Sequence, residues 1–345
     1  MAAALVLTLV LADGCEPLAP DSNGSVISFS ASSLKLSAGD TKGGTTIEGT
    51  NFAGSEKIAV FGWHSEGTGD KWVFTNKDVT CGAVEGSINK TSYTPGVPWE
   101  WVNHTTDYYD FIAFYKWKSG TYTKTASPTS VTVPYDAMTD QYDLMAAGSR
   151  RLGSAEKPNE VVPLTFRHLL CAVRVIIYND SEAKPFTLTD LHFHGLVVSD
   201  RVVLTLTPPS TISEEWIDPA TNTGSELFGF NSDVAVDYGT SYIWPNGLAG
   251  NYILLAPQTL TGSSKLEISY SYNAGTELAP VNKNSSLSLG LSTIPNATDG
   301  QLLTSWEQGR KYDYNIHIRV DGGVVVSVVT TEWDPIEAQT HGIMI

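Results

Sequence analysis

The residue with the clearest chemical signature near the start of the chain is Cys15. An almost wholly apolar run, residues 2–12, precedes Asp13, Gly14 and Cys15. The run is shorter than the roughly 20 residues that cross a bilayer, but it fits the apolar part of a secretory signal. A small residue directly before a cysteine is the arrangement of a bacterial lipobox, so we expect Cys15 to be lipidated after cleavage. A plain secretory signal is the alternative, because no Lys or Arg precedes the run.

Two histidines have a spacing that could begin a metal site. His192 and His194 are two positions apart in an alternating segment, so both side chains point to one face of a strand. A metal site needs at least a third ligand and supporting hydrogen bonds. The apolar neighbours Leu191, Phe193 and Leu196 favour the simpler interpretation that the histidines occupy the solvent face. No metal or cofactor is therefore expected.

Paired carboxylates could perform glycoside hydrolysis, which needs two acids across a cleft. Asp107, Asp110, Glu214 and Glu215 are candidates, but the chain has 37 acidic residues, so such pairs arise by chance. The sequence contains no nucleophile elbow, phosphate-binding glycine loop, zinc-protease motif or calcium loop. A secreted hydrolase is thus disfavoured, and the sequence predicts that the protein is not an enzyme.

Two tryptophans could bind sugar. Trp99 and Trp101 have the same parity in the sequence and could form a stacking platform for a glycan. The alternative is that they pack at a domain edge, which we favour in a chain with nine Trp.

The composition is that of a folded, acidic protein. The 345 residues are 41% hydrophobic and 17% charged, with 15 Tyr and 11 Phe besides the Trp, which argues against disorder. This length supports a sizeable core and favours about two domains. The net charge of −16 repels phosphate backbones and argues against nucleic acid as a partner.

Two cysteines remain besides Cys15. Cys81 and Cys171 could pair in an oxidising compartment, but a single pair so far apart in the sequence gives no disulfide framework. Cys171 shares its parity with Val173 and Val175, a pattern typical of a buried strand face. We therefore favour two separate buried thiols.

The elements that position these residues are strands. Alternation with a period of two is clearest over 266–272 and 312–320, and it predicts strands with one buried and one wet face. Asp321, Gly322 and Gly323 predict a tight turn into a partner strand over 324–329. Further strands are predicted over 26–29, 58–63, 71–74, 111–117, 169–178, 191–197, 202–206 and 252–255. No capped amphipathic helix is evident, so we predict an all-β fold of sandwiches, with a boundary in the polar stretch 148–158.

Two further segments indicate assembly rather than catalysis. Lys42, followed by Gly43 and Gly44, lies in a stretch typical of an exposed loop, where proteases cut readily. The chain ends with Ile336 and, further on, Ile343, Met344 and Ile345. This apolar tail must either pack on its own domain or add as a strand to an open sheet of a neighbour.

Several stretches, in their order and spacing, resemble the fimbrillin family of Bacteroidales surface proteins, of the FimA and Mfa-like type (type V pilins). The Lys-Gly-Gly-Thr-Thr-Ile start at residue 42 runs into Ile-Ala-Val-Phe-Gly, and Gly-Arg-Lys-Tyr occurs near the C-terminus. The matching stretches cover most of the chain: 41–63, 99–115, 143–146, 162–168, 256–258, 306–314 and Trp333.

The resemblance implies two stacked transthyretin-like β-sandwich domains. Residues 1–25 would be signal and tether, 26–155 the N-terminal domain with 26–42 as a removable leader strand, and 156–345 the C-terminal domain. It also implies export as an outer-membrane lipoprotein. A trypsin-like surface protease would cut between Lys42 and Gly43, and the tail 336–345 of another subunit would fill the groove as donor strand.

The function that these expectations favour is that of a structural subunit of a cell-surface fimbrium that supports adhesion. Its partners would be other fimbrial subunits, the protease and, before processing, the outer membrane. A surface-exposed lipoprotein adhesin or a glycan-binding tip subunit is the alternative.

Overall fold

The computed structural model is almost entirely β-structure, which confirms the predicted all-β class. It describes these residues: 28–33, 57–66, 69–85, 88–93, 108–115, 122–126, 129–152, 161–182, 184–222, 227–230, 232–245, 252–320 and 323–333. One short 3-10 turn, Leu291–Thr293, is the sole helical element within these ranges. No helix among the described residues is both long and apolar enough to cross a membrane.

Seven strands close into a barrel at one end of the molecule. In barrel order they are β1 (Ser28–Ser33), β4 (Ile88–Tyr93), β3 (Gly69–Glu85), β2 (Lys57–Glu66), β5 (Tyr108–Tyr115), β8 (Met145–Leu152) and β9 (Val161–His168). Nearly every side chain of β5 is buried, as its continuous apolar run requires. Phe61 and Phe114 stack between β2 and β5 with ring centroids 6.0 Å apart, which fixes this part of the core.

A second sheet packs on the barrel and draws strands from distant parts of the chain. Its strands are β6 (Thr123–Ala126), β7 (Thr129–Asp136), β12 (Leu196–Thr207), β13 (Thr211–Trp216) and β14 (Ala220–Asn222). The two approach each other closely at Gly148 of β8, where an added Cβ would lie 2.5 Å from Cδ1 of Ile212. The N–H of Arg150 also donates to the carbonyl of Pro209 at 2.6 Å. Sequence-distant strands thus form one layered unit with the barrel.

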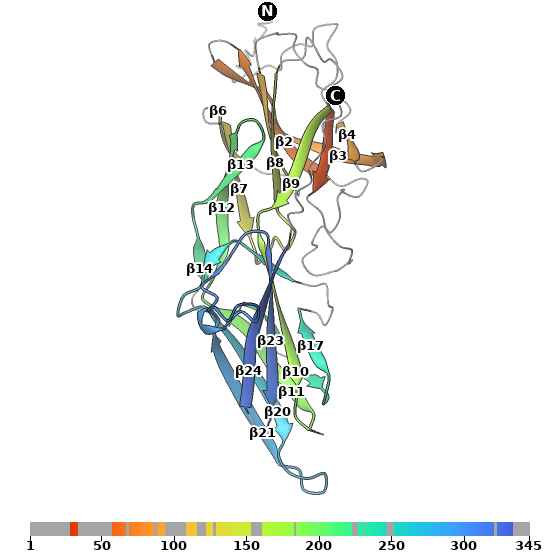
Figure 1. Cartoon of the computed structure of the whole chain (residues 1–345), viewed down its shortest axis with the longest axis vertical. Coiled ribbons are helices and arrows are strands. Elements are labelled where there is room, and N and C mark those ends of the chain that lie inside the picture. The colour runs from red at the N-terminus through yellow and green to blue at the C-terminus, as the bar shows by residue number, and fades with distance from the viewer. Residues whose placement is uncertain are drawn as a thin grey trace, which may run out of the picture.

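Two more sheets face each other at the other end of the molecule, around the strands β10, β23, β11 and β20 (Figure 1). One holds β10 (Cys171–Asn179), β17 (Ser241–Trp244), β18 (Ile253–Leu255), β23 (Arg310–Arg319) and β24 (Gly323–Glu332). The other holds β11 (Phe186–His194), β15 (Leu227–Phe230), β16 (Val234–Val236), β20 (Lys265–Asn273) and β21 (Asn282–Gly290). β19 (Gln258–Thr259) and β22 (Ser305–Trp306) form a separate two-stranded sheet. The rings of Phe193 and Trp244 pack against each other in the core between the sheets, with centroids 5.7 Å apart.

The two segments with the clearest alternation in the sequence are strands with one buried face, as predicted. Leu266, Ile268 and Tyr270 are buried in β20, and Tyr312 begins the buried series of β23. β23 pairs with β24 from Arg319↔Gly323 onward, which is the hairpin that the predicted turn requires. Cys171 is buried and free, so a disulfide between Cys171 and Cys81 is not formed.

One predicted strand, 191–197, is divided between two sheets. Gly195, with φ +63°, separates β11 from β12. A Cβ at this position would collide with the carbonyl of Ser263, and the left-handed backbone also favours glycine. The chain therefore turns at Gly195 from the sheet of β11 into the sheet of β12.

The polar stretch that suggested a domain boundary begins inside a strand. Residues 148–152 belong to β8 and pair with β5, and Gly148 is buried against Ile212 and Leu206 of the second sheet. β12 follows this stretch in the sequence and β7 precedes it, yet the two strands pair in one sheet.

Candidate functional site

The candidate assembly site is the seam that β1 closes in the barrel. β1 pairs with β9 in parallel through six residue pairs, from Ser28↔Val161 to Ser33↔Phe166. On its other side it pairs with β4 at Ser30↔Lys90 and Ala31↔Asn89. Within the described strands, β1 is what joins β9 to β4. The predicted leader strand overlaps β1, so the removal of this segment would open the barrel along two backbone edges.

β9 depends on β1 for most of its backbone pairing. Its other neighbour, β8, pairs with it only at Met145↔His168 and Ala146↔Arg167. Val162, Leu164 and Phe166 of β9 are fully buried, so the strand has an apolar face to protect. Pro163 lies in the middle of β9 opposite Ser30, and proline within a sheet is typical of an edge strand. β9 therefore has the features of an edge that needs a partner strand.

The end of the described chain lies beside the end of β9. The ring of Trp333 stacks on His168, the last residue of β9, with centroids 4.2 Å apart. The N–H of Trp333 donates to the carbonyl of Gly309 at 2.7 Å. His168 Nδ1 in turn lies 2.9 Å from the carboxylate of Asp143, and all three side chains are buried. The last described residue is thus fixed to the strand that β1 covers.

The sequence-predicted assembly residues lie outside the described residues. They are Cys15, Lys42, Gly43, Ile336, Ile343, Met344 and Ile345, and the predicted glycan platform of Trp99 and Trp101 also lies there. Lys42 nevertheless falls between β1 and β2 in the sequence, so a cut after it would separate β1 covalently from every later strand.

Two of the candidate catalytic carboxylates are held in ion pairs. Asp110 receives two hydrogen bonds from Arg150, each 2.6 Å long, across the β5–β8 pair. Thr129 donates a third at 3.1 Å. Glu214 is paired with Arg167. Each of these carboxylates accepts hydrogen bonds from a guanidinium, an arrangement that suits a structural role better than catalysis.

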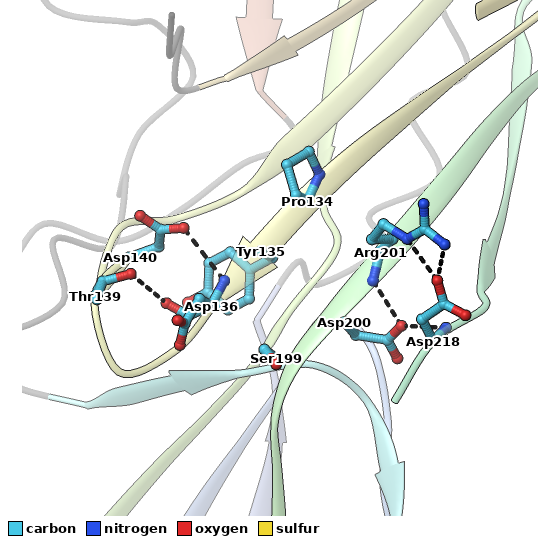
Figure 2. A pocket seen from close by; sticks show the side chains of 9 residues that line it. All are labelled: Pro134, Tyr135, Asp136, Thr139, Asp140, Ser199, Asp200, Arg201 and Asp218. Atoms are coloured by element: carbon cyan, nitrogen blue, oxygen red, sulfur yellow. Dashed lines mark hydrogen bonds and ion pairs between the residues drawn. The ribbon is translucent and has the colours of Figure 1, made fainter. Parts of the chain in front are cut away.

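A shallow hollow beside β7 and β12 is lined with acidic side chains (Figure 2). Asp140 accepts a hydrogen bond from the N–H of Asp136 at 3.2 Å. Asp200 accepts from the N–H groups of Arg201 and Asp218, and Asp218 pairs with the guanidinium of Arg201. These carboxylates hold turns in place, so their hydrogen bonds account for their presence in the hollow.

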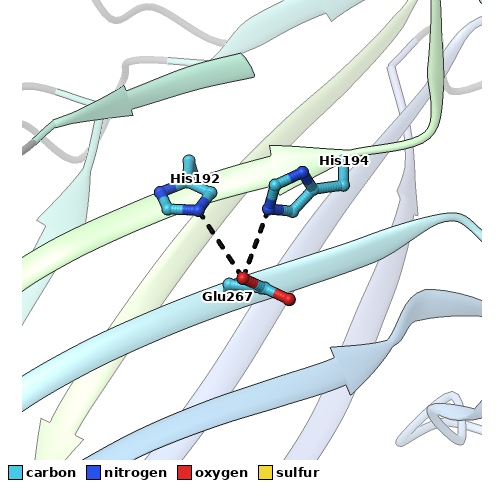
Figure 3. Close-up of side chains that lie close together, drawn as sticks. All are labelled: His192, His194 and Glu267. Carbon is cyan, nitrogen blue, oxygen red and sulfur yellow. Dashed lines mark ion pairs between the residues drawn. The ribbon is translucent and has the colours of Figure 1, made fainter. Parts of the chain in front are cut away.

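The histidine pair has a neighbour that sequence reasoning missed. Glu267 of β20 lies opposite His192 of β11, and its carboxylate approaches both His192 and His194 (Figure 3). The alternation of β20 places Glu267 on the polar face, which was readable from the sequence. The pairing of β20 with β11, which brings the three residues together, was not.

The comparisons with known proteins agree with this fold. A family model described as fimbrillin-like matches residues 45–333. No curated protein matches the sequence. The crystal structure of a candidate cell adhesion protein from Bacteroides ovatus has 11% sequence identity and a TM-score of 0.52, covering 90% of this chain and 98% of that one. This value shows a shared fold.

Two further solved structures have lower TM-scores. A candidate cell adhesion protein from Bacteroides uniformis has 15% identity and a TM-score of 0.48, covering 91% of this chain and 100% of that one. A fimbrilin from Porphyromonas gingivalis has 11% identity and a TM-score of 0.42, covering 90% of this chain and 98% of that one.

Proposed function

The chain belongs to the fimbrillin-like family, and we propose that it is a structural, non-enzymatic subunit of a cell-surface fimbrium that supports adhesion. Its partners are other fimbrial subunits. The match to a family model over most of the chain supports the proposal, and the ion pairs of Asp110 and Glu214 agree with a structural role. The single observation that carries the mechanism is the position of β1 between β9 and β4.

The proposed assembly begins with a lipoprotein. The lipid on Cys15 holds the subunit at the outer membrane, and β1 covers the seam until a trypsin-like protease cuts between Lys42 and Gly43. Loss of the leader strand exposes the backbone edge of β9 and the apolar surface beside Val162 and Leu164. Such an edge binds an incoming strand through main-chain hydrogen bonds.

The incoming strand in this proposal is the tail 336–345 of another subunit. Ile336, Ile343, Met344 and Ile345 supply the apolar side chains that the opened seam lacks. Because the tail of one copy enters the seam of the next, the contact does not close on itself and produces a filament. The stacked ring of Trp333 provides a fixed point from which each tail extends.

Two stacked sandwich domains, with a boundary near residues 155–156, remain part of the proposal. The barrel and its covering sheet would form the N-terminal domain, and the sheets of β10 and β11 the C-terminal one. β9, β12, β13 and β14 would then be contributions from beyond the boundary to the N-terminal unit, since β9 pairs with β1 and β12 pairs with β7.

The test is limited trypsin treatment of the purified lipid-free chain. We expect a new N-terminus at Gly43, release of the fragment that contains β1, and ladders of oligomers on a gel run without heating. Lys42→Gln should abolish the cut before Gly43. Because a cut after Lys35 would also separate β1 from the later strands, the ladders are compared in a Lys35→Gln background, where adding Lys42→Gln should abolish them. Lys35→Gln is the matched control, because Lys35 lies between β1 and Lys42 and its loss should change nothing.

A second variant tests the role of the tail separately from the role of the cut after Lys42. A chain lacking residues 336–345 should be cut after Lys42 and keep its unfolding midpoint, but should form no ladder. If the processed full-length chain stays monomeric at high concentration, the polymerising mechanism is wrong. If the truncated chain unfolds, the tail belongs to the core of its own subunit and is not a donor strand.

A further inference from the structure

Three side chains with metal-binding atoms converge on the face of the β11–β20–β21 sheet that points away from the sandwich core. His192 and His194 come from β11 and Glu267 from β20 (Figure 3). The Nε2 atom of His194 lies 3.3 Å from Oε2 of Glu267, and Nε2 of His192 lies 3.7 Å from the same oxygen. All three ligand atoms lie within 4.8 Å of one another.

These separations match the first coordination sphere of a zinc-like ion. Nitrogen and oxygen ligands lie about 2.0–2.1 Å from zinc, so two ligands in a tetrahedral sphere lie roughly 3.4 Å apart. We propose that His192, His194 and Glu267 form a binding site for a divalent transition metal of the zinc class, with one coordination position open to water or to a group from outside the chain.

The surrounding residues orient two of the three ligands. Asp190 Oδ1 lies 3.0 Å from Nδ1 of His192, and Ser288 Oγ donates to Oε1 of Glu267 at 3.2 Å. A carboxylate on one ring nitrogen of a histidine fixes the proton there and leaves the other nitrogen as a metal ligand. The inner atoms, Nε2 of His192 and Oε2 of Glu267, are therefore left facing the common centre.

A cation at that centre resolves an otherwise unfavourable arrangement. With its proton on Nδ1, His192 presents a lone pair at Nε2 to the negatively charged oxygen of Glu267. Nε2 of His194 is shielded from solvent and makes no hydrogen bond within the described part of the chain. A metal ion at the centre would give all three atoms one cationic partner and would remove the repulsion between the lone pair and the carboxylate.

The backbone of β15 encloses one side of the site. Gly229 lies so close to β11 that an added Cβ would collide with the carbonyl of Leu191 and lie 2.5 Å from Cβ of His192. The preceding residue, Phe228, has φ +50°. As a result His192 is only 6% exposed, whereas His194 and Glu267 are partly open and provide an entry path. Lys265 pairs with His194 in the sheet, and its positive charge opposes metal binding on this face.

The inference is independent of the proposed fimbrial assembly, and its test uses zinc alone. Chelator-treated, untagged protein is titrated with Zn²⁺ by calorimetry, and metal content is measured after dialysis. We expect one Zn²⁺ per chain. His194→Gln and Glu267→Gln should each weaken binding at least tenfold, and Asp190→Asn should weaken it about 10–100-fold, as loss of such a supporting residue commonly does.

Matched controls keep the result specific. His317→Gln removes a histidine that also lies 3.0 Å from a carboxylate, that of Asp180, but belongs to no group of three metal-binding residues among those described. Zinc binding should be unchanged in this variant. Cobalt absorption typical of a tetrahedral site should appear in the parent chain and be lost in His194→Gln.

Unfolding of each metal-free variant shows whether the sheet is intact. Absence of zinc binding by the parent chain would overturn the site. So would equal binding by a folded His194→Gln variant, which would mean that the three residues form only an ion-paired cluster.

Discussion

Trp333 stacks on the imidazole of His168 with ring centroids 4.2 Å apart and an angle of 13° between the planes. The two residues are 165 positions apart in the sequence, and both are buried. His168 ends β9, and Trp333 directly follows β24. The stack therefore joins the end of β24 to the end of β9, the strand that β1 covers in the barrel.

Truncation of Trp333 should destabilise the whole chain. Trp333→Ala removes a buried ring and should lower the free energy of unfolding by about 3–5 kcal/mol, measured by urea denaturation. Trp333→Phe should cost less, because it keeps a ring to stack on His168. The indole N–H that Phe lacks also has no hydrogen-bond partner among the described residues. Equal stability of Trp333→Ala and the parent chain would show that the stack is not an anchor.

The tight contact between the barrel and the second sheet can be tested with a pair of compensating substitutions. In Gly148→Ala the new Cβ would lie 2.5 Å from Cδ1 of Ile212 and 2.7 Å from Cδ1 of Leu206. Such overpacking should cost about 1–3 kcal/mol of unfolding free energy.

Ile212→Val removes the nearest methyl group and alone should cost about 0.5–1.5 kcal/mol. The double variant should be more stable than the sum of the two changes predicts, because the two side chains share one space. Strict additivity in a double-mutant cycle would contradict this packing.

The sequence was sufficient to predict which face of a strand is buried, but not which strands pair with each other. The alternation over 266–272 correctly placed Leu266 and Ile268 in the core, because a half-buried strand needs one apolar face. Nothing in that alternation shows that β20 pairs with β11, or that β12 pairs with β7, because sheet pairing joins residues far apart in the chain. Glu267 was therefore missed as a neighbour of the histidines. The turn at Gly195 was missed for the same reason: its necessity comes from the carbonyl of Ser263, 68 residues later.

Cys171 should be inert in the folded protein. Burial raises the pKa of its thiol well above the usual range, and the thiol donates to the carbonyl of Leu255 at 3.3 Å. Because the thiolate is the reactive form, iodoacetamide at mildly alkaline pH should leave Cys171 unmodified until urea unfolds the chain. Mass spectrometry of the tryptic peptide 168–174 measures the modification.

A cysteine on the surface provides the control for that experiment. Leu278 is 99% exposed, and Leu278→Cys should be modified without denaturant. Comparable modification rates at Cys171 and at this surface position would mean that the core around β10 opens readily in the native state.

Asp200 makes the stability of the protein depend on pH in a defined direction. It is only 6% exposed, and burial, the largest influence, raises the pKa of its carboxyl above the usual value of 3.8. The folded state therefore binds the proton more tightly than the unfolded state. The stabilising contribution of the protonated form is fully present below about pH 3.8 and is lost as the pH rises through the raised pKa.

Asp200→Asn should abolish this loss. The amide oxygen can still accept the hydrogen bonds that Oδ1 receives from the N–H groups of Arg201 and Asp218, at 2.6 and 2.8 Å, and the side chain no longer ionises. The stability of the variant relative to the parent chain should thus increase from about pH 4 upward and then level off. Urea denaturation at several pH values measures the difference. Asp233→Asn, at an exposed position, controls for the loss of one negative charge from an acidic protein. A difference that shrinks with rising pH would mean that Asp200 is stabilised as a carboxylate, with its pKa lowered by the N–H groups that it binds.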